Sequence, residues 1–574
     1  MRTTKSSKIA ALAVGLALVV AACGSDSSTK TTAAPSTTTP GTTPGTTGST
    51  TPGTTPTTGG TGSGMTITYE IADSANWNDN TPISWADFQC TWQATVNTPA
   101  SLSTVGYDQI TSVEKGASDK EVVVQFKSPF AAYKTLFGGL LEKSKMKDCM
   151  DVSTDFGTDG IKFSGKEWML DSWTAEQIVY VPNPAYKGPR TPDVKKVVIV
   201  PTGDTTALKA GTVDFIFPQA YTGIDKELSD PNIKYDSALG GSFEALYFQQ
   251  KSGPFADKDY REAFSKSIDL QALYAQIYAP FAQGTPLLDC GPIAPGQYCD
   301  HLWKDTYDPT GAADVLTKAG WTKGSDGFWK NPKGEVPVVR WMINTGNTRR
   351  ESAQAFLIPK LATLGFKVKA DNCEATPCVF QTRLPALDYD LAMYISTVSP
   401  DPIYLTSSFV CDQIPSDANG NKGQNNVGWC NQDASTALHN ADKEIDDAKR
   451  TADIKTAIKA MHDDYVLLPT LQFPNIGAYR TDKVSGTQKE LANYTAFYDW
   501  YQWKDVNGDG QIVIGAEQFP TNDCSNPITD CASSSWFEWV IANPVLPGAY
   551  LTTNDLTFVL SDMLKSEPVV KVGT

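Results

Sequence analysis

Cysteines are the residues whose number and spacing suggest chemistry most directly. The chain has 11 cysteines in 574 residues, and one of them, Cys23, ends an apolar segment at the N-terminus. The others are even in number, which is typical of disulfides in an exported protein. Short separations predict four pairs and elimination a fifth: Cys290 with Cys299, Cys373 with Cys378, Cys411 with Cys430, Cys524 with Cys531, and Cys90 with Cys149.

A metal site is the alternative use of these cysteines. Zinc sites commonly draw ligands from a C-x-x-C pair or from closely spaced histidines. No C-x-x-C pair occurs, and the histidines, His301, His439 and His462, are scattered. The sequence therefore favours disulfides and predicts neither a metal nor another cofactor.

The acidic turn DVNGDG, residues 505–510, is a second candidate site. Asp505, Asn507 and Asp509 occupy the first, third and fifth positions of a calcium loop, with Gly510 at the sixth. The twelfth position, where such loops carry a bidentate carboxylate, is Ala516. Because Asn-Gly and Asp-Gly are also common turn dipeptides, a plain connecting turn is the favoured interpretation and calcium the alternative.

The common sequence motifs of catalytic sites are missing, so the sequence does not favour an enzyme. The sequence has no G-x-S-x-G elbow, no H-E-x-x-H motif and no complete Gly-rich phosphate loop. Carboxylates are numerous enough to include a glycosidase pair, so an exported enzyme is the competing class. The net charge of -16 argues against a surface for nucleic acid or an anionic membrane.

The N-terminus has the features of an export signal. Arg2, Lys5 and Lys8 precede the apolar run IAALAVGLALVV, which is shorter than the roughly 20 residues that a membrane span needs. Residues 1–22 are therefore predicted to be a signal peptide. The sequence VAACG resembles a bacterial lipobox, in which Cys23 would carry the lipid; an ordinary signal peptide with a chance cysteine is the alternative.

A spacer follows Cys23. Residues 24–64 are almost entirely Thr, Pro, Gly and Ser, which cannot offset the entropy of folding. With the lipidated cysteine, residues 23–64 are predicted to tether the folded part to the outer face of the bacterial cytoplasmic membrane.

The elements that must position any site alternate between strand and helix. MTITYEI and EVVVQF read as strands, and SWADFQCTWQATVN as a helix with Ser84 as its N-cap. KKVVIVPTGDTTALKAGTVDFIF reads as strand, helix, strand, and a further helix begins after Asp269. This alternation, without a repeat of 20 to 50 residues, predicts an α/β protein with more than one lobe.

Several motifs in a fixed order resemble one known family. WNDNTPISWADF, VPNPAYKGPRTPDVKKVVIVPTGDTTALKAGTVDF, GPFADKDYREAFSKSIDLQAL and YDPTGAADVLTKAGW are similar to segments of the family-5 extracellular solute-binding proteins, the oligopeptide, dipeptide and nickel receptors of ABC importers. Asn80 and Trp85 stand where that family usually has Gly and Ala. The resemblance implies a type II (class C) periplasmic-binding-protein fold, with two lobes plus an accessory lobe.

The order of segments departs from the family at the chain ends. Members usually begin with a strand and a proline-containing turn, but here the spacer leads directly to MTITYEI. GQIVIGAEQFP, residues 510–520, resembles the missing opening strand, and residues 526–570 resemble what should follow. This predicts a circular permutation in which Thr574 lies beside Met65; an unrelated appended β-module is the alternative.

The resemblance also implies lobe boundaries. They are residues 65–164 with 518–574 for the accessory lobe, 165–242 with 477–517 for the central lobe, and 243–476 for the opposing lobe.

Ligand contacts are implied in the same way. In peptide receptors of this family an aspartate holds the peptide's ammonium group, but Val398 occupies that position here, which leaves peptides and other solutes open. An aromatic side chain such as Trp429 can equally pack in the hydrophobic core instead of contacting a ligand. The residues predicted to contact ligand are Tyr394, Ser396, Val398, Ser399, Asn426, Trp429, Gln518 and Phe519.

The predicted function is therefore binding without catalysis. The chain is expected to capture a peptide or other small solute and to deliver it to the permease and ATPase subunits of an ABC importer. It would contact the membrane through its lipid and bind no nucleic acid. The alternative is a lipid-anchored sensor or adhesion protein that uses the same fold without transport.

Overall fold

The computed structural model divides the chain into two units, Met1–Gly60 and Thr61–Thr574. It describes residues 64–99, 101–218, 220–221, 223–281, 287–304, 307–397, 400–416, 423–488, 498–516, 519–520, 522, 525–529, 537–553 and 556–573. The predicted signal peptide, Cys23 and the spacer up to Ser63 lie outside the described residues. Among those described, no helix combines the length and apolarity that crossing a membrane requires.

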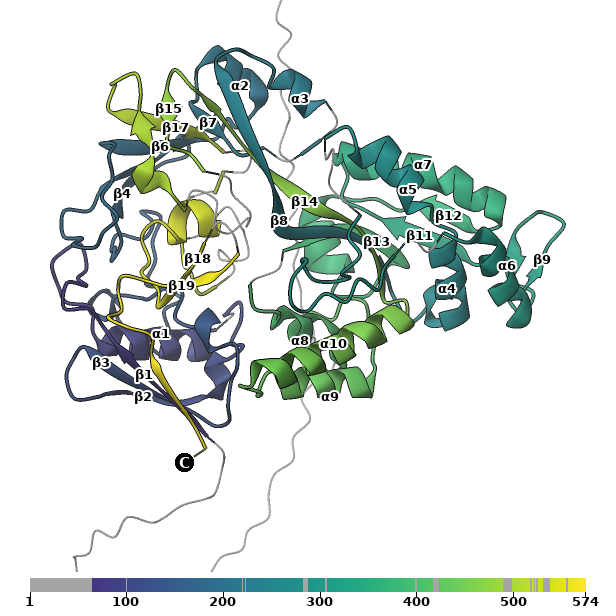
Figure 1. Cartoon of the computed structure of the whole chain (residues 1–574), viewed down its shortest axis with the longest axis horizontal. Helices are drawn as coiled ribbons and strands as arrows, with labels where there is room; N and C mark the ends of the chain where they lie inside the picture. The colour runs from purple at the N-terminus through teal and green to yellow at the C-terminus, as the bar shows by residue number, and fades with distance from the viewer. Residues whose placement is uncertain are drawn as a thin grey trace, which may run out of the picture. The chain divides into compact units, whose positions relative to one another are not determined.

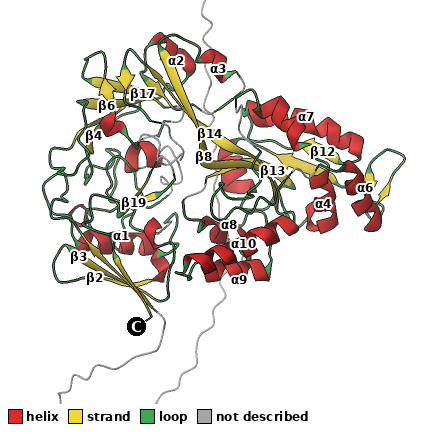
Figure 2. Cartoon of the chain, in the orientation of Figure 1, coloured by secondary structure: helices red, strands yellow, loops and turns green. Residues whose placement is uncertain are grey.

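A long mixed sheet runs through the second unit (Figures 1 and 2). Its parallel pairs are β11 with β12 and β13, and β17 with β6 and β7, whereas the other pairs are antiparallel. The predicted α/β class is confirmed. In order, the strands are β12 (Lys367–Ala370), β11 (Val338–Met342), β13 (Leu391–Thr397), β8 (Ile233–Phe248), β14 (Leu467–Arg480), β7 (Phe215–Ile216), β17 (Gln511–Gly515), β6 (Lys196–Val200), β5 (Ile178–Pro182) and β4 (Trp168–Trp173).

The long strands β8 and β14 join the two halves of this sheet. They pair from Ile233 opposite Arg480 to Tyr247 opposite Leu467. The register shifts twice, beside Pro469 and Pro474, because proline lacks the N–H that a regular ladder needs. The segments named in the sequence analysis do not include β8, whose Gly-Gly interior weakens the strand pattern.

A smaller sheet has its own helix. Its order is β2 (Ile110–Lys115), β3 (Glu121–Phe126), β1 (Met65–Glu70) and β20 (Val569–Val572). Helix α1 (Trp85–Asn97) contacts β2 and begins at the predicted N-cap, where the Ser84 N–H donates to Asp87 Oδ2 at 2.8 Å. The disulfide between Cys90 and Cys149 ties this helix to a later loop.

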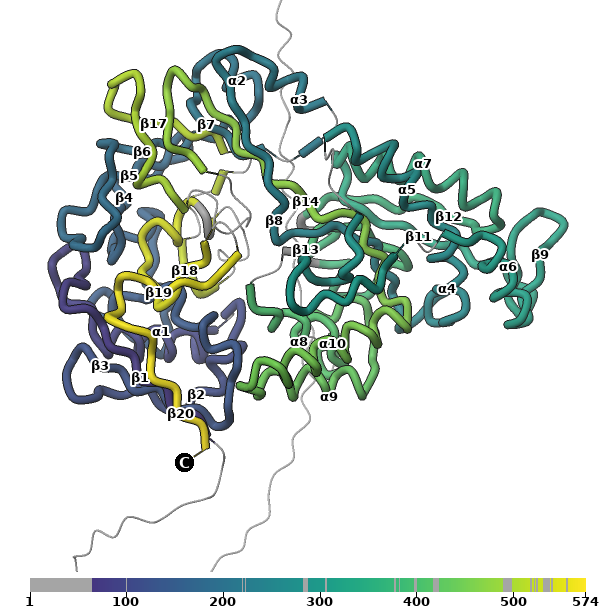
Figure 3. Tube along the Cα trace, viewed as in Figure 1, coloured from purple at the N-terminus to yellow at the C-terminus, as the bar shows by residue number. Residues whose placement is uncertain are grey.

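Strands from the C-terminal part of the chain belong to sheets whose other strands come from earlier in the sequence. Strand β17 lies between β6 and β7, and β20 pairs with β1 with Met65 opposite Val572 (Figure 3). The Gly573 N–H donates to the Gly64 carbonyl at 2.9 Å. Thr574 itself is outside the described residues, but its neighbour Gly573 lies at the start of β1.

Asparagine or aspartate caps many of the helices, because these side chains accept from the unpaired first N–H groups. Asp204, Asp269 and Asn347 accept from the third following N–H at 2.7, 2.8 and 3.1 Å, and the predicted start at Asp269 is confirmed. The remaining helices are α2 (Thr205–Ala210), α3 (Ile224–Glu227), α4 (Lys258–Lys266), α5 (Leu270–Leu273), which continues as the π-turn η5 (Tyr274–Tyr278), α6 (Pro309–Lys318), α7 (Thr348–Leu364), α8 (Tyr404–Phe409), α9 (Gln432–Ala441) and α10 (Asp447–Asp463).

Short two-stranded sheets complete the described secondary structure. They are β9 (Thr322–Lys323) with β10 (Trp329–Lys330), β15 (Val484–Ser485) with β16 (Lys504–Asp505), and β18 (Tyr550–Thr552) with β19 (Phe558–Leu560).

Two large hydrophobic cores meet at β17. The first contains the buried apolar residues of the smaller sheet and of β4 to β6, and the second those around β8, β11 and β14. Ile512 and Ile514 belong to the first core, whereas Val513 packs against the second. Because side chains alternate along a strand, β17 serves both cores at once.

Four of the five predicted disulfides are present: Cys90–Cys149, Cys290–Cys299, Cys373–Cys378 and Cys411–Cys430. The fifth pair, Cys524 with Cys531, lies outside the described residues.

The acidic turn joins β16 to β17. Asp505 accepts from the N–H groups of Gly508 and Gly510, at 2.7 and 2.6 Å. Asp509 accepts from the N–H of Gln511 and from the Asn507 amide, at 3.0 and 2.7 Å. These bonds stabilise the turn, as is typical of Asn-Gly and Asp-Gly turns.

Candidate functional site

A cavity of about 670 Å³ lies between the N-terminal end of α7, η5 and the segment after β7. Its volume falls within the roughly 300–1,000 Å³ that small-molecule sites occupy. It is lined by Ala220, Tyr221, Gln276, Ile277, Gly346, Asn347, Thr348, Arg349, Ser352, Ala355 and Phe356.

Local sequence explains how the chain turns into α7 at the cavity wall. Strand β11 is followed by Gly346, whose φ of +80° is a conformation that glycine adopts without strain. Asn347 then caps the helix by accepting from the Arg350 N–H at 3.1 Å. The turn thereby places Arg349, the second residue of a 17-residue helix, against the cavity.

A buried group of charges lies behind this wall; we call Glu244, Arg349 and Arg350 the arginine-rich cluster. Arg349 donates to both Glu244 carboxylate oxygens, at 3.0 and 3.3 Å, and Arg350 Nε donates to Oε1 at 2.8 Å. The Tyr278 hydroxyl donates to Oε2 at 2.9 Å. The side chains of Glu244, Arg349 and Arg350 are 0%, 4% and 7% exposed, so the cluster is shielded from water.

Electrostatics keep Glu244 ionised. Burial by itself would raise the pKa of this carboxyl, but the charges and hydrogen bonds of Arg349 and Arg350 outweigh burial and lower the pKa to about 2. Each arginine also has a neutral partner: Arg349 donates to the Ala220 carbonyl at 3.2 Å, and Arg350 donates to Asn344 Oδ1.

Two of the predicted ligand residues lie on the neighbouring strand β13. Tyr394 stacks on Tyr247 with ring centroids 4.0 Å apart, and Ser396 Oγ is 2.6 Å from the Tyr247 hydroxyl oxygen. Tyr394 pairs with Ala245 and Ser396 with Phe243, whereas Glu244 faces Ile395. Strand alternation therefore places Tyr394 and Ser396 on the opposite face of the sheet from Glu244.

Topology nevertheless relates the cavity to the segment after β13. Strands β11 and β13 are parallel neighbours, so the turn to α7 and the C-terminal end of β13 lie at the same edge of the sheet. Ligands of open α/β sheets bind at such edges, outside the carboxyl ends of the strands. Val398 and Ser399 themselves lie outside the described residues.

The other predicted ligand residues are dispersed. Trp429 is 3% exposed, and its indole N–H donates to Asp464 Oδ2 at 3.0 Å. The carbonyl of Asn426 accepts from the Tyr389 hydroxyl at 2.7 Å. Phe519 packs against the first core, and Gln518 is outside the described residues. Their roles in ligand binding stay predictions.

Glu244, Arg349, Tyr278 and Tyr221 are not among the residues predicted from the sequence. Two signals were available: a lone carboxylate inside the otherwise apolar run SFEALYF, and adjacent arginines just after a glycine-containing turn. A buried acidic residue requires a partner, but the partner is 105 positions away.

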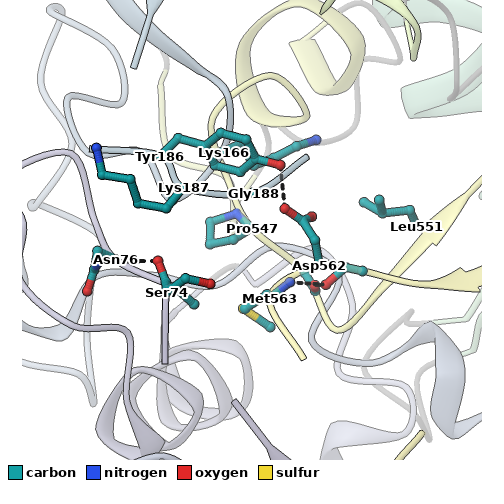
Figure 4. A pocket seen from close by; sticks show the side chains of 14 residues that line it. Ser74, Asn76, Lys166, Tyr186, Lys187, Gly188, Pro547, Leu551, Asp562 and Met563 are labelled. Atoms are coloured by element: carbon teal, nitrogen blue, oxygen red, sulfur yellow. Dashed lines mark hydrogen bonds between the residues drawn. The ribbon is translucent and has the colours of Figure 1, made fainter. Parts of the chain in front are cut away.

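A second, much smaller cavity lies where the C-terminal segment meets the first half of the chain (Figure 4). Tyr186 donates to Asp562 at its edge, and Lys166 Nζ donates to the Asn543 carbonyl at 2.6 Å. Burial lowers the pKa of Lys166. The volume of about 20 Å³ is that of a single water molecule, so this cavity is too small for a solute.

Among the described residues, metal-ligating side chains come together at Asp289, Cys290, Cys299 and His301. His301 Nδ1 lies 2.9 Å from Asp289 Oδ1. The two cysteines form a disulfide with each other, so the group lacks the thiolates that a zinc site would use.

Known proteins resemble most of the chain. The model of the bacterial extracellular solute-binding proteins, family 5, matches residues 61–416. The oligopeptide-binding protein OppA of Mycobacterium bovis is 25% identical over 450 residues, which cover 75% of this chain and 73% of that protein, and OppA of Mycobacterium tuberculosis matches equally. These relatives are named as binding proteins.

Solved structures share the fold. The periplasmic EDTA-binding protein EppA has a TM-score of 0.68 and 21% identity, covering 77% of this chain and 85% of its own. AppA from Bacillus subtilis, solved with a nonapeptide, has a TM-score of 0.62 and 18% identity, covering 77% and 87%. The fold is that of a type II periplasmic binding protein, and the chain belongs to the bacterial extracellular solute-binding proteins of family 5.

Proposed function

We propose that this protein captures a small solute and delivers it to the permease and ATPase subunits of an ABC importer, without catalysis of its own. The observation that carries the proposal is the cavity of about 670 Å³ at the edge where β11 and β13 end, in a chain that belongs to a solute-binding family. The named function of OppA, oligopeptide binding, makes peptides one candidate class.

Closure of lobes around the solute would signal the loaded state to the permease. In this proposal, residues 65–164 with 518–574 form an accessory lobe, residues 165–242 with 477–517 a central lobe, and residues 243–476 an opposing lobe. The pairing of β8 with β14, which joins the sheet halves, would carry the closing motion.

A ligand screen tests the binding step. The protein is unfolded and refolded to remove co-purified solute, and its thermal midpoint is then measured with peptides, sugars, organic acids and metal ions. A solute that binds the native state raises the midpoint by mass action. A panel in which every class leaves the midpoint unchanged contradicts the proposal.

Uptake of a labelled ligand by cells with and without the gene tests delivery. Loss of uptake in the deletion strain supports import, whereas binding without any uptake favours a sensor.

Anchoring is a separate part of the proposal: Cys23 carries a lipid that holds the protein at the outer face of the cytoplasmic membrane. Replacing Cys23 with Ala removes the thiol that would be acylated. The variant is expected in the culture medium and the parent in the membrane fraction, as measured by immunoblotting. Equal membrane association of the two would contradict the lipid anchor.

We also infer that the domain is circularly permuted relative to its family. The position of β17 between β6 and β7, and the hydrogen bond from Gly573 to Gly64, support this inference. A chain that opens at the acidic turn and joins residue 573 to residue 65 should keep its thermal midpoint within a few degrees and its ligand binding. A control opened inside β8 should not fold; equal failure of both chains would contradict the inference.

A further inference from the structure

Four side chains with metal-binding atoms come together in the segment between η5 and α6. We call Asp289, Cys290, Cys299 and His301 the cysteine–histidine group; one ligand atom from each lies within 4.8 Å of the others. His301 Nδ1 is 2.9 Å from Asp289 Oδ1 and 3.6 Å from Cys299 Sγ. Cys290 Sγ is 3.6 Å from the same carboxylate oxygen. Since a disulfide joins the two sulfurs, the contacts close a ring around a common centre.

Most of these distances match a tetrahedral zinc site. Zn²⁺ binds thiolate sulfur at about 2.3 Å and imidazole nitrogen or carboxylate oxygen at about 2.0–2.2 Å, which places neighbouring ligand atoms about 3.3–3.8 Å apart. The two contacts at 3.6 Å already lie in this range, and the one at 2.9 Å would lengthen slightly. The sulfur atoms are the exception, because they are bonded to each other and must separate before either can bind a metal as a thiolate.

The surrounding chain holds both ends of the group in place. The Trp303 N–H donates to the Asp289 carbonyl at 3.0 Å, and the buried Trp303 indole donates to the Leu467 carbonyl at 3.2 Å. His301 has a φ of +53°, a left-handed conformation that is uncommon outside glycine. Such a backbone conformation often occurs where the position of a side chain matters. Here it accompanies an imidazole that contacts both Asp289 and Cys299.

Solvent reaches the group, and so can a metal ion and a reductant. The side chains of His301 and Asp289 are 59% and 34% exposed. Cys299 is half-buried, whereas Cys290 is buried. An attacking thiolate therefore meets Cys299 Sγ first, and Cys290 is the sulfur that leaves.

We propose that the cysteine–histidine group is a redox-controlled zinc site. A dithiol reductant gives two electrons to the Cys290–Cys299 bond and itself becomes a disulfide, which leaves two cysteine thiols. Zn²⁺ then displaces the thiol protons into solvent and is bound by both thiolates, His301 and Asp289. Exchange with a small-molecule disulfide reverses the first step and releases the ion. None of the four residues lines the large cavity, so the site does not depend on the proposed solute binding.

Zinc titration of the oxidised and the reduced protein tests the proposal. The protein is reduced with excess dithiol, freed of reductant without air, and titrated by calorimetry beside an untreated sample. The reduced protein should bind Zn²⁺ at least about 100-fold more tightly, because only this form supplies thiolates. Co²⁺ in place of zinc should give the visible absorption bands of tetrahedral thiolate coordination. Equal affinity of the two samples would overturn the proposal.

Cysteine variants assign the zinc to this group. The double variant Cys290→Ala with Cys299→Ala should lose the gain in zinc affinity on reduction. Cys411→Ala with Cys430→Ala removes a different disulfide and is the matched control, which should keep that gain. The opposite pattern, or a gain that both double variants keep, would place the zinc elsewhere and overturn the proposal.

A histidine variant tests the site with every disulfide kept. His301→Asn removes the imidazole but suits the left-handed backbone, and should weaken zinc binding by the reduced protein at least about 10-fold. His439→Asn, at another exposed histidine, is the control and should bind as the parent does. Circular dichroism follows the fold of each sample. An unchanged affinity in His301→Asn would contradict the site, as would a parent that unfolds on reduction and does not recover with Zn²⁺.

Discussion

Two clusters of charged side chains in the same half of the molecule differ in their ratio of carboxylates to guanidinium groups. The arginine-rich cluster has one carboxylate for two guanidinium groups, beside a large cavity. A second group, the aspartate-rich cluster of Asp401, Asp442 and Arg450, has the reverse ratio. There Arg450 donates two hydrogen bonds of 2.8 Å to Asp401, and Asp442 accepts from Thr406 at 3.1 Å.

A carboxyl surplus can be neutralised by a proton, whereas an arginine surplus cannot. Burial raises the pKa of Asp442 to about 7, against a smaller opposing effect of Arg450, so this side chain is largely neutral at mildly acidic pH. The aspartate-rich cluster thus needs no external ion. An arginine stays charged at every physiological pH, so the guanidinium groups of the other cluster cannot be neutralised in this way.

The largest expected effect comes from removing the single carboxylate of the arginine-rich cluster. Glu244→Gln removes the carboxylate that both buried guanidinium groups bind, and should lower the free energy of unfolding by about 3–5 kcal/mol. Urea denaturation at pH 7 measures the change. Glu351→Gln, an exposed carboxylate at the start of the same helix, is the control. A loss below about 1 kcal/mol would contradict this expectation.

Removing an arginine should distinguish the two clusters. Arg450→Met removes both guanidinium hydrogen bonds to the buried Asp401 carboxylate and should cost about 3 kcal/mol. Arg349→Met leaves Glu244 paired with Arg350 and with the Tyr278 hydroxyl, so its cost should be smaller than that of Arg450→Met. Thermal and urea unfolding of both variants measures the difference. Equal losses would contradict the expectation that Glu244 keeps enough partners without Arg349.

Acid should destabilise the protein through Glu244. Its pKa is lowered from an ordinary value of 4.5 to about 2, so the stability it contributes is present above pH 4.5 and is lost as pH falls through 2. The contribution is up to about 3 kcal/mol. Urea titrations between pH 6 and pH 2 should show a smaller slope for Glu244→Gln than for the parent. Parallel curves would contradict this linkage.

The smallest effect is expected at Asp442, and its sign is opposite. Because its pKa is raised from 3.8 to about 7, the stability of the neutral carboxyl is fully present below pH 3.8 and is lost as pH rises through 7. Asp442→Asn should therefore stabilise the protein at pH 8 by about 1–2 kcal/mol and have little effect near pH 4, since partial exposure limits the cost of ionisation. Thermal midpoints at both pH values measure this. A variant that is less stable at pH 8 would contradict it.

Features that depend on residues close to one another in the sequence could be predicted from the sequence alone. The caps at Ser84 and Asp269, the α/β class and three disulfides followed from local patterns and spacing, because capping and short loop closure involve residues that are close in sequence. The disulfide between Cys90 and Cys149, which are 59 residues apart, was predicted by elimination. The order of β6, β17 and β7 was not a local property. It was not predicted: the resemblance of residues 510–520 to the family's opening strand led only to the permutation, which stays a proposal.

The candidate site was much less predictable. Tyr394 and Ser396 were named, but strand alternation puts them on the opposite sheet face from Glu244. Arg349 was not named, since nothing in TRRES distinguishes a buried arginine from an exposed one. The arginine signal becomes meaningful only beside Glu244, 105 positions earlier.

The sequence by itself determined the family, the elements and their caps, because these depend on short motifs and on periodicity. Tertiary structure decided which charges share a buried volume. Strand β8 brings Glu244 under the N-terminal end of α7, where one carboxylate meets two guanidinium groups beside a cavity. Electrostatic interactions in a low-dielectric interior depend on distances through space and not on separation along the chain, so only the folded chain could reveal this cluster.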